Sequence, residues 1–328
     1  MHNLIGLDIG GTKCAVILGR IEREDSLTLL DKLVYRTLDS PGPDHMIPVL
    51  QKGIEQILLK NGLTAEDLSG IGISCGGPLD SKTGVILSPP NLPGWDHVHI
   101  IDRFQEKFGK PTAIQNDANA CALAEWKFGA GMGYRNIIFL TFGTGMGAGL
   151  ILDGKLYAGT NDNAGEVGHI RLDSFGPVGY GKAGSFEGFC SGGGIAQLGK
   201  IRAMERLQMG QRVSFCAGVN EIDTITAKIV AEAAVKGDPV AIEIYRECGA
   251  YLGKGLSILI DILNPELIIL GTIFVRSRQL LQHELDKNIA IEALPLARKV
   301  CKIVPAALDE KIGDYASLSV AAYNLQDP

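Results

Sequence analysis

The sequence predicts an α/β protein built of two lobes. Two glycine-rich turns indicate this, one in each half of the 328-residue chain, at residues 10–12 and 143–145. Each turn follows a short apolar run that is typical of a buried strand, and another apolar run comes after it. Turns of this kind present backbone N–H groups and a threonine hydroxyl to an anion. Two of them in one chain therefore suggest two lobes that grip one polyphosphate.

The first half alternates strands and helices. An amphipathic helix over residues 46–60 ends at Asn61-Gly62, a typical C-terminal stop. The other helix of this half is expected over residues 101–108. Its strands are expected over residues 4–8, 13–18, 27–37, 70–74 and 111–115. Three strands, a helix, a strand, a helix and a strand form one α/β unit.

The second half repeats this plan without repeating the sequence. Its helices are expected over residues 119–129, 221–236, 239–263, 277–288 and 314–325. Its strands are expected over residues 137–141, 148–152, 266–271 and 300–305. No Pro- or Ser-rich linker separates the halves, so we expect the boundary near Asp117. The predicted lobes are residues 1–117 with 306–328, and residues 118–305.

Composition and charge exclude several classes of partner. The net charge of −6 provides no basic surface for nucleic acid or an anionic membrane. The longest apolar stretch, residues 256–263, contains Asp261 and is too short to span a bilayer. The seven scattered cysteines form no CxxC pair, which favours reduced thiols in a cytoplasmic protein. The first strand begins so close to Met1 that we expect no signal peptide.

Asp8 stands at the end of an apolar strand, beside the first glycine turn. Magnesium prefers one or two carboxylates together with phosphates and water, so Asp8 is a candidate for holding a magnesium–phosphate complex. The alternative is a turn aspartate that caps its own backbone. The second turn, taken alone, is also compatible with a plain tight turn between two strands.

Asp117 follows another strand, in the run Gln115-Asn116-Asp117-Ala118-Asn119. Ligand groups gather at the carboxyl ends of strands in open α/β sheets. Phosphoryl transfer to an alcohol needs a carboxylate that receives the hydroxyl proton, so Asp117 is a candidate general base. It could equally be the N-cap of the next helix.

Glu166 and His169 lie in a glycine-containing run over residues 163–169, and Glu187 follows later. Carboxylates with a histidine suit the hydrogen-bonding groups of a polyol, although a histidine satisfied within its loop is an open alternative. Residues 176–183 match the first seven positions of GxxxxGK[ST]. Ala183 lacks the hydroxyl, and no strand comes before this segment, so a P-loop is not expected. Gly10-Gly11 also does not match the GxGxxG pattern of dinucleotide-binding folds.

The order and spacing of these motifs resemble the ROK family of bacterial sugar kinases (glucokinase- and fructokinase-like) and their repressor relatives. The resemblance covers nearly the whole chain and includes residues 90–95 and 265–271. The motifs that carry it are Asp8-Ile9-Gly10-Gly11-Thr12-Lys13, Asn116-Asp117-Ala118-Asn119, Thr141-Phe142-Gly143-Thr144-Gly145 and Gly165-Glu166-Val167-Gly168-His169. It implies the two-lobed actin-like ATPase (ribonuclease H-like) fold, with the active site in the cleft between the lobes.

The resemblance also implies a role for each candidate residue. Asp117 is the expected base, and Asp8 is expected to position Mg²⁺, through water. The expected ATP- and phosphate-binding residues are Asp8, Gly10, Gly11, Thr12, Lys13, Gly143, Thr144, Gly145 and Gly271. The family usually has a second glycine after the last of these, where this chain has Thr272. The expected sugar-binding residues are Gly77, Asn91, Asn116, Asp117, Glu166, His169 and Glu187.

The activity implied is ATP- and magnesium-dependent phosphorylation of a hexose hydroxyl. The family resemblance further suggests a homodimer or homotetramer whose partners are the sugar and ATP. Repressor relatives carry a helix-turn-helix ahead of the first strand, and this chain has no residues there, which argues against DNA binding. A non-catalytic sugar sensor remains an alternative. An acetate kinase-like enzyme is a second alternative, although the polar set fits a polyol better than a small carboxylate.

The chain departs from the family at a structural zinc site. Many members carry a CxCGxxGCxE stretch whose three cysteines bind zinc together with the histidine of the preceding motif. Aligned on Glu187, the cysteine positions hold Val178, Tyr180 and Ser185. A closed zinc site needs four ligands, and only His169 and Cys190 are left, so we expect no zinc. The segment 173–183 is then expected to be more mobile, or to be held by packing of Phe175, Tyr180 and Phe186.

Overall fold

The computed structural model describes residues 1–23, 26–40 and 42–326, and its internal contacts form two units. Unit 1 comprises residues 1–135, 149–164 and 307–328, and unit 2 comprises residues 136–148 and 165–306. The last two residues of the predicted smaller lobe, 327–328, lie outside the described residues. The division differs from the predicted boundary at Asp117, because helix α3 (Asp117–Phe128) packs against β4, β8 and α10 of unit 1.

The first sheet, in unit 1, has the strand order β3-β2-β1-β4-β8. These strands are β1 (His2–Ile9), β2 (Lys13–Arg23), β3 (Ser26–Arg36), β4 (Leu68–Cys75) and β8 (Thr112–Asn116). Strands β1 to β3 form an antiparallel meander, whereas β4 runs parallel to β1 and β8 parallel to β4. In this register Asp8 is level with Ser74, and Cys75 is level with Asn116. The carboxyl ends of three strands therefore meet at one edge.

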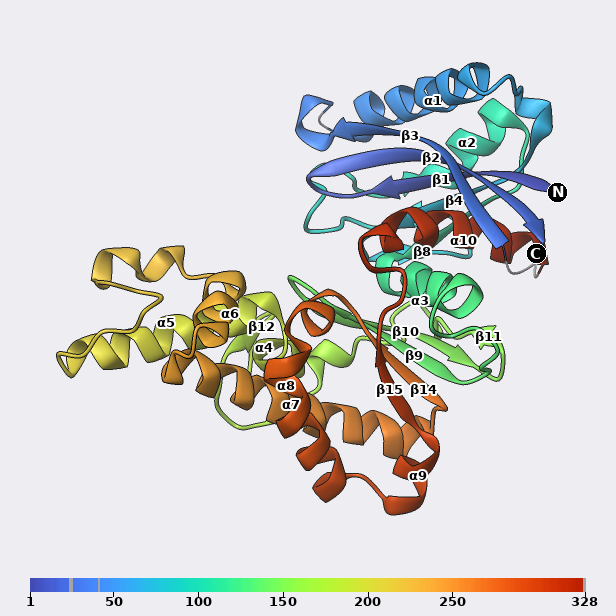
Figure 1. Ribbon diagram of the computed structural model, residues 1–328. Helices are drawn as coiled ribbons and strands as arrows, with labels where there is room; N and C mark the ends of the chain where they lie inside the picture. Colours follow the sequence, from blue (N-terminus) through green and yellow to red (C-terminus); the bar gives the residue numbers. More distant parts are fainter. Residues whose placement is uncertain (24–25, 41, 327–328) are drawn as a thin grey trace. The chain divides into compact units, whose positions relative to one another are not determined.

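Helices cover both faces of this sheet (Figure 1). Helices α1 (Pro43–Lys60) and α2 (Ile100–Phe108) lie on one face, and α10 (Ile312–Gln326) lies on the other. The buried apolar side of α1 joins the core of the sheet, because burying such a stripe removes apolar surface from water. Between residues 79 and 99, the short strands β5 (Leu79–Asp80), β6 (Val85–Ile86) and β7 (Val98–His99) form a separate small sheet.

Glycine allows α10 to lie directly on the first sheet. A β-carbon at Gly72 would collide with the backbone of Ser317 and Ala321, and one at Gly6 would collide with the Ser317 hydroxyl. Helix α10 therefore occupies the space that larger side chains at Gly6 and Gly72 would fill.

The second sheet has the strand order β11-β10-β9-β14-β15. Its strands are β9 (Ile137–Phe142), β10 (Met146–Leu152), β11 (Lys155–Leu156), β14 (Leu267–Leu270) and β15 (Lys302–Pro305). Strand β14 is fully buried and pairs in parallel with β9 and β15, as expected for a continuous apolar run. The chain passes from unit 2 to unit 1 within β10.

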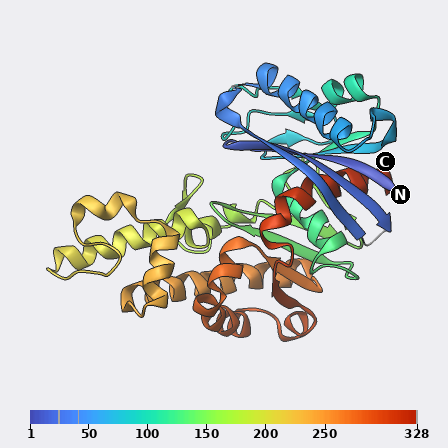
Figure 2. The same cartoon turned by 45° about the horizontal axis from the view of Figure 1, so that its top comes forward.

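The helices of unit 2 pack around α7 (Pro239–Leu263), which runs along α8 (Thr272–Glu292). Helices α5 (Gly192–Gln208) and α6 (Ala227–Val235) lie side by side and extend away from β9 and β14 (Figures 1 and 2). Shorter elements are α4 (Phe186–Phe189), α9 (Pro295–Val300), β12 (Val178–Gly179) and β13 (Lys182–Ala183). Within the described ranges, no helix combines the length and the apolar character that crossing a membrane requires.

Three of the longer helices differ from the sequence-based expectation, and the short elements α4, α9, β5–β7 and β11–β13 were not predicted. Helix α5 was not predicted, because it begins with three glycines that lower helix propensity. The predicted helix 221–236 is a 3₁₀ turn (Val219–Thr224) followed by α6, which Thr226 caps. Helix α8 starts at Thr272 and bends at Ser277, where the helix was expected to begin. The other predicted elements are present, with ends that differ by a few residues.

Candidate active site

The first glycine turn, residues 10–12, joins β1 to β2. The Gly10 N–H donates to the carbonyl of Lys13 (3.1 Å). Buried Thr37 braces the turn from the side: its hydroxyl donates to the Gly10 carbonyl (2.6 Å), and its N–H donates to the Thr12 carbonyl (3.0 Å). Thr12 and Lys13 remain exposed. Sequence reasoning missed Thr37, because no local pattern reveals a partner that lies so far along the chain.

Asn91 lies against this turn. A β-carbon on Gly11 would collide with the Asn91 carbonyl oxygen, so glycine is what lets the two backbones approach. A β-carbon on Gly77, which follows β4, would have no atom within 4 Å. The space beside Gly77 is therefore open within unit 1.

Asp117 is the first residue of α3 and is not its cap. The Asn116 side chain caps the helix, because its Oδ1 accepts the N–H of Asn119 (2.8 Å). Asp117 Oδ1 accepts the neighbouring N–H of Ala118 (2.8 Å). Burial raises the pKa of the Asp117 carboxyl, and the Ala118 N–H opposes this shift. Solvent still reaches the Asp117 side chain. Its position in the fold, and not its pKa, is therefore what makes it a candidate general base.

Asp8 shares this edge of the sheet with Asp117. Burial is the largest cause that raises the pKa of Asp8, to about 6, and the Lys13 ammonium opposes it. The carboxylates of Asp314 and Asp117 raise it further through charge repulsion. A partly exposed carboxylate beside a turn of backbone N–H groups is a suitable ligand for Mg²⁺ or its waters, and a bound cation would lower this pKa again.

The second glycine turn, residues 143–145, joins β9 to β10 and is held by the start of α5. The N–H groups of Gly192 and Gly193 donate to the carbonyls of Gly143 (2.7 Å) and Thr144 (3.4 Å). Sequence reasoning also missed this contact. Its signal in the sequence is the run of three glycines that follows Ser191.

Glu187 links the predicted sugar-binding residues of unit 2 to the second turn. Its Oε2 accepts the N–H of Met146 (3.0 Å), the residue directly after Gly145. A β-carbon on Gly168 would collide with the Met146 carbonyl and would touch Glu187. The short helix Val167–His169, with Glu166 before it, therefore lies against both β10 and α4.

Gly271 directly follows β14 and is the N-cap of α8. Its N–H donates to the Leu140 carbonyl (3.0 Å) on neighbouring β9. A β-carbon on Gly192 would lie 3.5 Å from Ile273, so the first turns of α5 and α8 meet beside the second glycine turn. Helix N-termini carry partial positive charge, which suits phosphate. The first N–H groups of α5 already donate to the second glycine turn and to Ser191, whereas the start of α8 has no side-chain cap.

Each unit thus gathers its own part of the predicted site. In unit 1 these residues are Asp8, Gly10, Gly11, Thr12, Lys13, Gly77, Asn91, Asn116 and Asp117. In unit 2 they are Gly143, Thr144, Gly145, Glu166, His169, Glu187 and Gly271.

The chain is similar to known proteins over most of its length. The model of a family described as ROK family matches residues 4–322. A glucokinase of Streptomyces coelicolor is 32% identical over 268 residues, which cover 81% of this chain and 80% of the relative. A xylose repressor of Bacillus spizizenii is 28% identical over 305 residues, covering 93% of this chain and 73% of the repressor.

A solved structure of this family also matches the chain in fold. The ROK family glucokinase of Streptomyces griseus, determined in complex with glucose and AMPPNP, superposes with a TM-score of 0.73 at 30% identity. The match covers 98% of this chain and 99% of that one. The α/β architecture with these two sheets is therefore the actin-like ATPase fold, which confirms the predicted fold class.

Proposed function

The chain belongs to the ROK family, and we propose that it transfers the γ-phosphoryl group of ATP to a hydroxyl of a hexose. The observation that carries the proposal is the position of Asp117. Asp117 is the first residue of α3, and solvent reaches its side chain. It lies at the edge of the sheet where Asp8 and the first glycine turn also lie. The similarity to glucokinases supports the same activity.

In this proposal Asp117 is the general base. A hydroxyl is a weak nucleophile until a positioned carboxylate receives its proton during transfer. The helix cap is provided by Asn116, so the Asp117 carboxylate is not needed for that role. Asp117 Oδ1 accepts the adjacent Ala118 N–H, and a carboxylate has further oxygen lone pairs for a substrate hydroxyl.

Each glycine turn is proposed to bind phosphate groups of ATP. Residues 10–12 with Lys13 contribute backbone N–H groups, a hydroxyl and an ammonium, whereas residues 143–145 contribute a turn flanked by two helix N-termini. Asp8 would hold Mg²⁺, through water, and the ion would neutralise charge on the phosphates. Gly271, at the start of α8, is proposed to lie beside the adenosine part of ATP.

The proposed sugar-binding residues are mostly hydrogen-bonding side chains in each unit. Carboxylates and amides around a polyol supply acceptors and donors at fixed positions. Glu187 has one oxygen on the Met146 N–H, and we propose that the other oxygen accepts a sugar hydroxyl. The remaining members of this proposed set are Gly77, Asn91, Asn116, Glu166 and His169.

A panel of hexoses and N-acetylated hexosamines tests the proposal. Purified protein with ATP and Mg²⁺ should release ADP with at least one sugar well above the rate without sugar, and removal of Mg²⁺ by EDTA should stop it. The same panel on the Asp117→Asn variant serves as the matched control. ADP release that no sugar stimulates would contradict the proposal.

A sugar-responsive regulator is the second candidate, since the repressor relative aligns over 93% of this chain. Such a protein would bind a sugar without transferring phosphate. Saturable sugar binding in calorimetry, together with no ADP release, would favour it over the kinase.

A further inference from the structure

The segment that follows His169 carries no donor set for a structural metal. The positions at which the resemblance places zinc-binding cysteines hold Val178, Tyr180 and Ser185. The His169 ring instead meets the edge of the Tyr180 ring, with centroids 5.2 Å apart. In the described part of the chain, no three His, Cys, Asp or Glu residues are grouped to hold a metal ion. These residues do not fit zinc, so other contacts hold the segment.

Within residues 173–184, strands β12 and β13 form a hairpin over residues 178–183. Tyr180 (φ 41°) and Gly181 (φ 77°) form its turn, and both have the left-handed backbone that tight hairpins favour. The predicted packing of Phe175 is wrong, because that side chain is 83% exposed, and Tyr180 is also mostly exposed (73%) although its ring meets His169. Phe186, by contrast, is fully buried, as expected.

A first clamp ties this hairpin to α5. The side-chain amide of Gln197 donates from Nε2 to the Val178 carbonyl (2.8 Å) and accepts the Val178 N–H at Oε1 (3.0 Å). One amide thus satisfies both backbone groups of β12 at this residue. Such a pair fixes orientation as well as distance.

A second clamp ties the start of the segment to α7. The Tyr251 hydroxyl donates to Asp173 Oδ2 (2.6 Å), and its ring stacks on Phe189 with centroids 3.5 Å apart at 7°. This hydrogen bond is the largest cause that lowers the pKa of Asp173. The Lys254 ammonium lies 4.7 Å from the centre of the Tyr251 ring. Tyr251 therefore joins three elements: the segment, α4 and α7.

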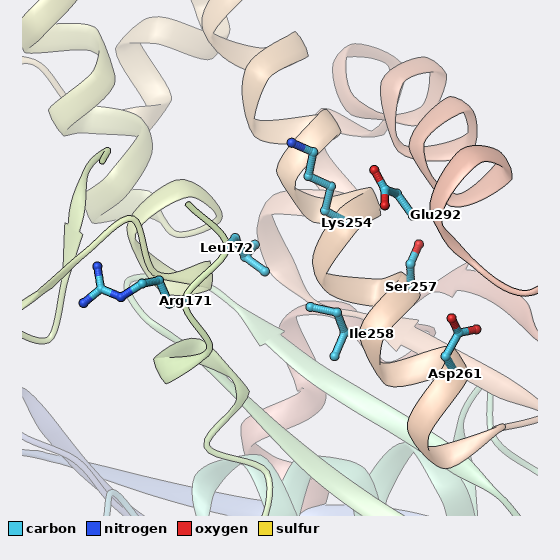
Figure 3. A pocket seen from close by; sticks show the side chains of 7 residues that line it. All are labelled: Arg171, Leu172, Lys254, Ser257, Ile258, Asp261 and Glu292. Carbon is cyan, nitrogen blue, oxygen red and sulfur yellow. The ribbon is translucent and has the colours of Figure 1, made fainter. Parts of the chain in front are cut away.

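A pocket of about 240 Å³ lies close to this clamp (Figure 3). Leu172 lines it on one side and Ile258 on the other, and the Arg171 guanidinium points away from Lys254. The Tyr251–Asp173 bond connects the residue that follows Leu172 to α7.

We propose that Tyr251 and Gln197 are positioning residues that hold this segment in place of the structural zinc that the family resemblance implies. They hold the hairpin and α4 so that Glu187 stays bonded to the Met146 N–H beside the second glycine turn. The effect on sugar binding rests on the function proposed above, whereas the effect on the order of the segment does not.

Hydrogen exchange of the ligand-free protein tests the structural part. Tyr251→Phe keeps the ring stacking but removes the bond to Asp173, and Gln197→Leu removes both amide bonds. In the double variant, amides of residues 172–184 should exchange roughly tenfold faster, which corresponds to about 1.4 kcal/mol. Tyr180→Phe, in the same segment, is the matched control and should exchange like wild type. Unchanged exchange in the double variant would overturn the proposal.

Steady-state kinetics test the positioning role. The double variant should raise the sugar KM about tenfold, with kcat at saturating sugar within about twofold. Asp173→Asn, which keeps an acceptor for the Tyr251 hydroxyl, should have a smaller effect than Asp173→Ala, and this pair decides the question if the double variant fails to fold. A fall in kcat with an unchanged sugar KM would overturn the role.

The metal content and the wild-type activity separate the possible failures. One zinc per chain in protein purified without chelator would overturn the proposal that Tyr251 and Gln197 hold the segment without a metal. If the wild-type protein phosphorylates no sugar, the proposed function is wrong. The hydrogen-exchange result would still test whether Tyr251 and Gln197 hold the segment.

Discussion

Asp8 and Asp117 are two carboxylates with different surroundings on one edge of a sheet. Asp8 lies partly buried between β2 and the start of α10, and Asp117 opens α3 with its side chain reached by solvent. A base must meet the substrate hydroxyl, and a group that holds hydrated Mg²⁺ must meet the phosphates. Their different positions fit these different roles.

The raised pKa of Asp8 predicts a pH-dependent cost to stability. Between about pH 4 and pH 6 the unfolded chain loses this proton first, so the folded state binds more protons and its stability falls as pH rises. Asp8→Asn removes the cost. Its free energy of unfolding relative to wild type should rise from pH 4 to pH 7 by up to about 3 kcal/mol, given 1.36 kcal/mol per pKa unit from 3.8 to about 6.

Urea unfolding at several pH values without Mg²⁺ measures this difference. Exposed Asp39→Asn is the control and should show no such trend. A difference between Asp8→Asn and wild type that stays constant from pH 4 to pH 7 would contradict the burial of Asp8.

Among the elements, each glycine turn depends on a brace from elsewhere in the chain. Thr37 holds the first turn, and the start of α5 holds the second. A turn that must present N–H groups to phosphate gains from such bracing, because less ordering is then needed on binding.

Thr37→Val should weaken nucleotide binding. Valine keeps the shape of threonine but loses the hydroxyl that donates to the Gly10 carbonyl. We expect the KM for ATP to rise roughly fivefold, for one hydrogen bond of about 1 kcal/mol, with the sugar KM unchanged. Thr37→Ser keeps the hydroxyl and should behave like wild type; equal effects of both variants would argue against the brace.

The sequence predicted the two glycine turns and the strands on either side of them, because strands and tight turns are local patterns. It also placed Asp8 and Asp117 at strand ends, which the parallel pairing of β1, β4 and β8 brings to one edge. It missed Thr37 and the start of α5, since their role depends on tertiary contacts. Their own sequence carries little sign of it.

The role of Asp117 as base or cap shows the same limit. From the sequence both were open, and the geometry decided only the cap, which Asn116 provides. Likewise, the lost cysteines predicted a segment without zinc, but not the Gln197 and Tyr251 contacts that the structure shows there.

At the scale of the whole molecule, the two ends of the chain build one unit. Helix α10 packs on β1 and β4, more than 200 residues away in sequence, at positions where glycine leaves room. Unit 1 therefore cannot complete its core until the last helix has been synthesised.

Gly72→Ala tests this dependence. The added methyl group would meet the backbone of α10 at Ser317 and Ala321, which cannot give way without moving the helix. We expect the free energy of unfolding to fall by about 1–3 kcal/mol. Gly218→Ala, where a β-carbon meets no atom within 4 Å, should stay within about 0.5 kcal/mol of wild type in the same urea titration. Equal stability of the two variants would contradict the close packing of α10.

The most direct test of the central claim compares wild type with Asp117→Asn in ATP-dependent formation of sugar phosphate, using the best sugar from the panel. We predict a loss of roughly 10²–10⁴-fold in kcat for the variant, while calorimetry shows that it still binds the sugar. Sugar phosphate formed by Asp117→Asn at the wild-type rate would contradict the assignment of Asp117 as the base.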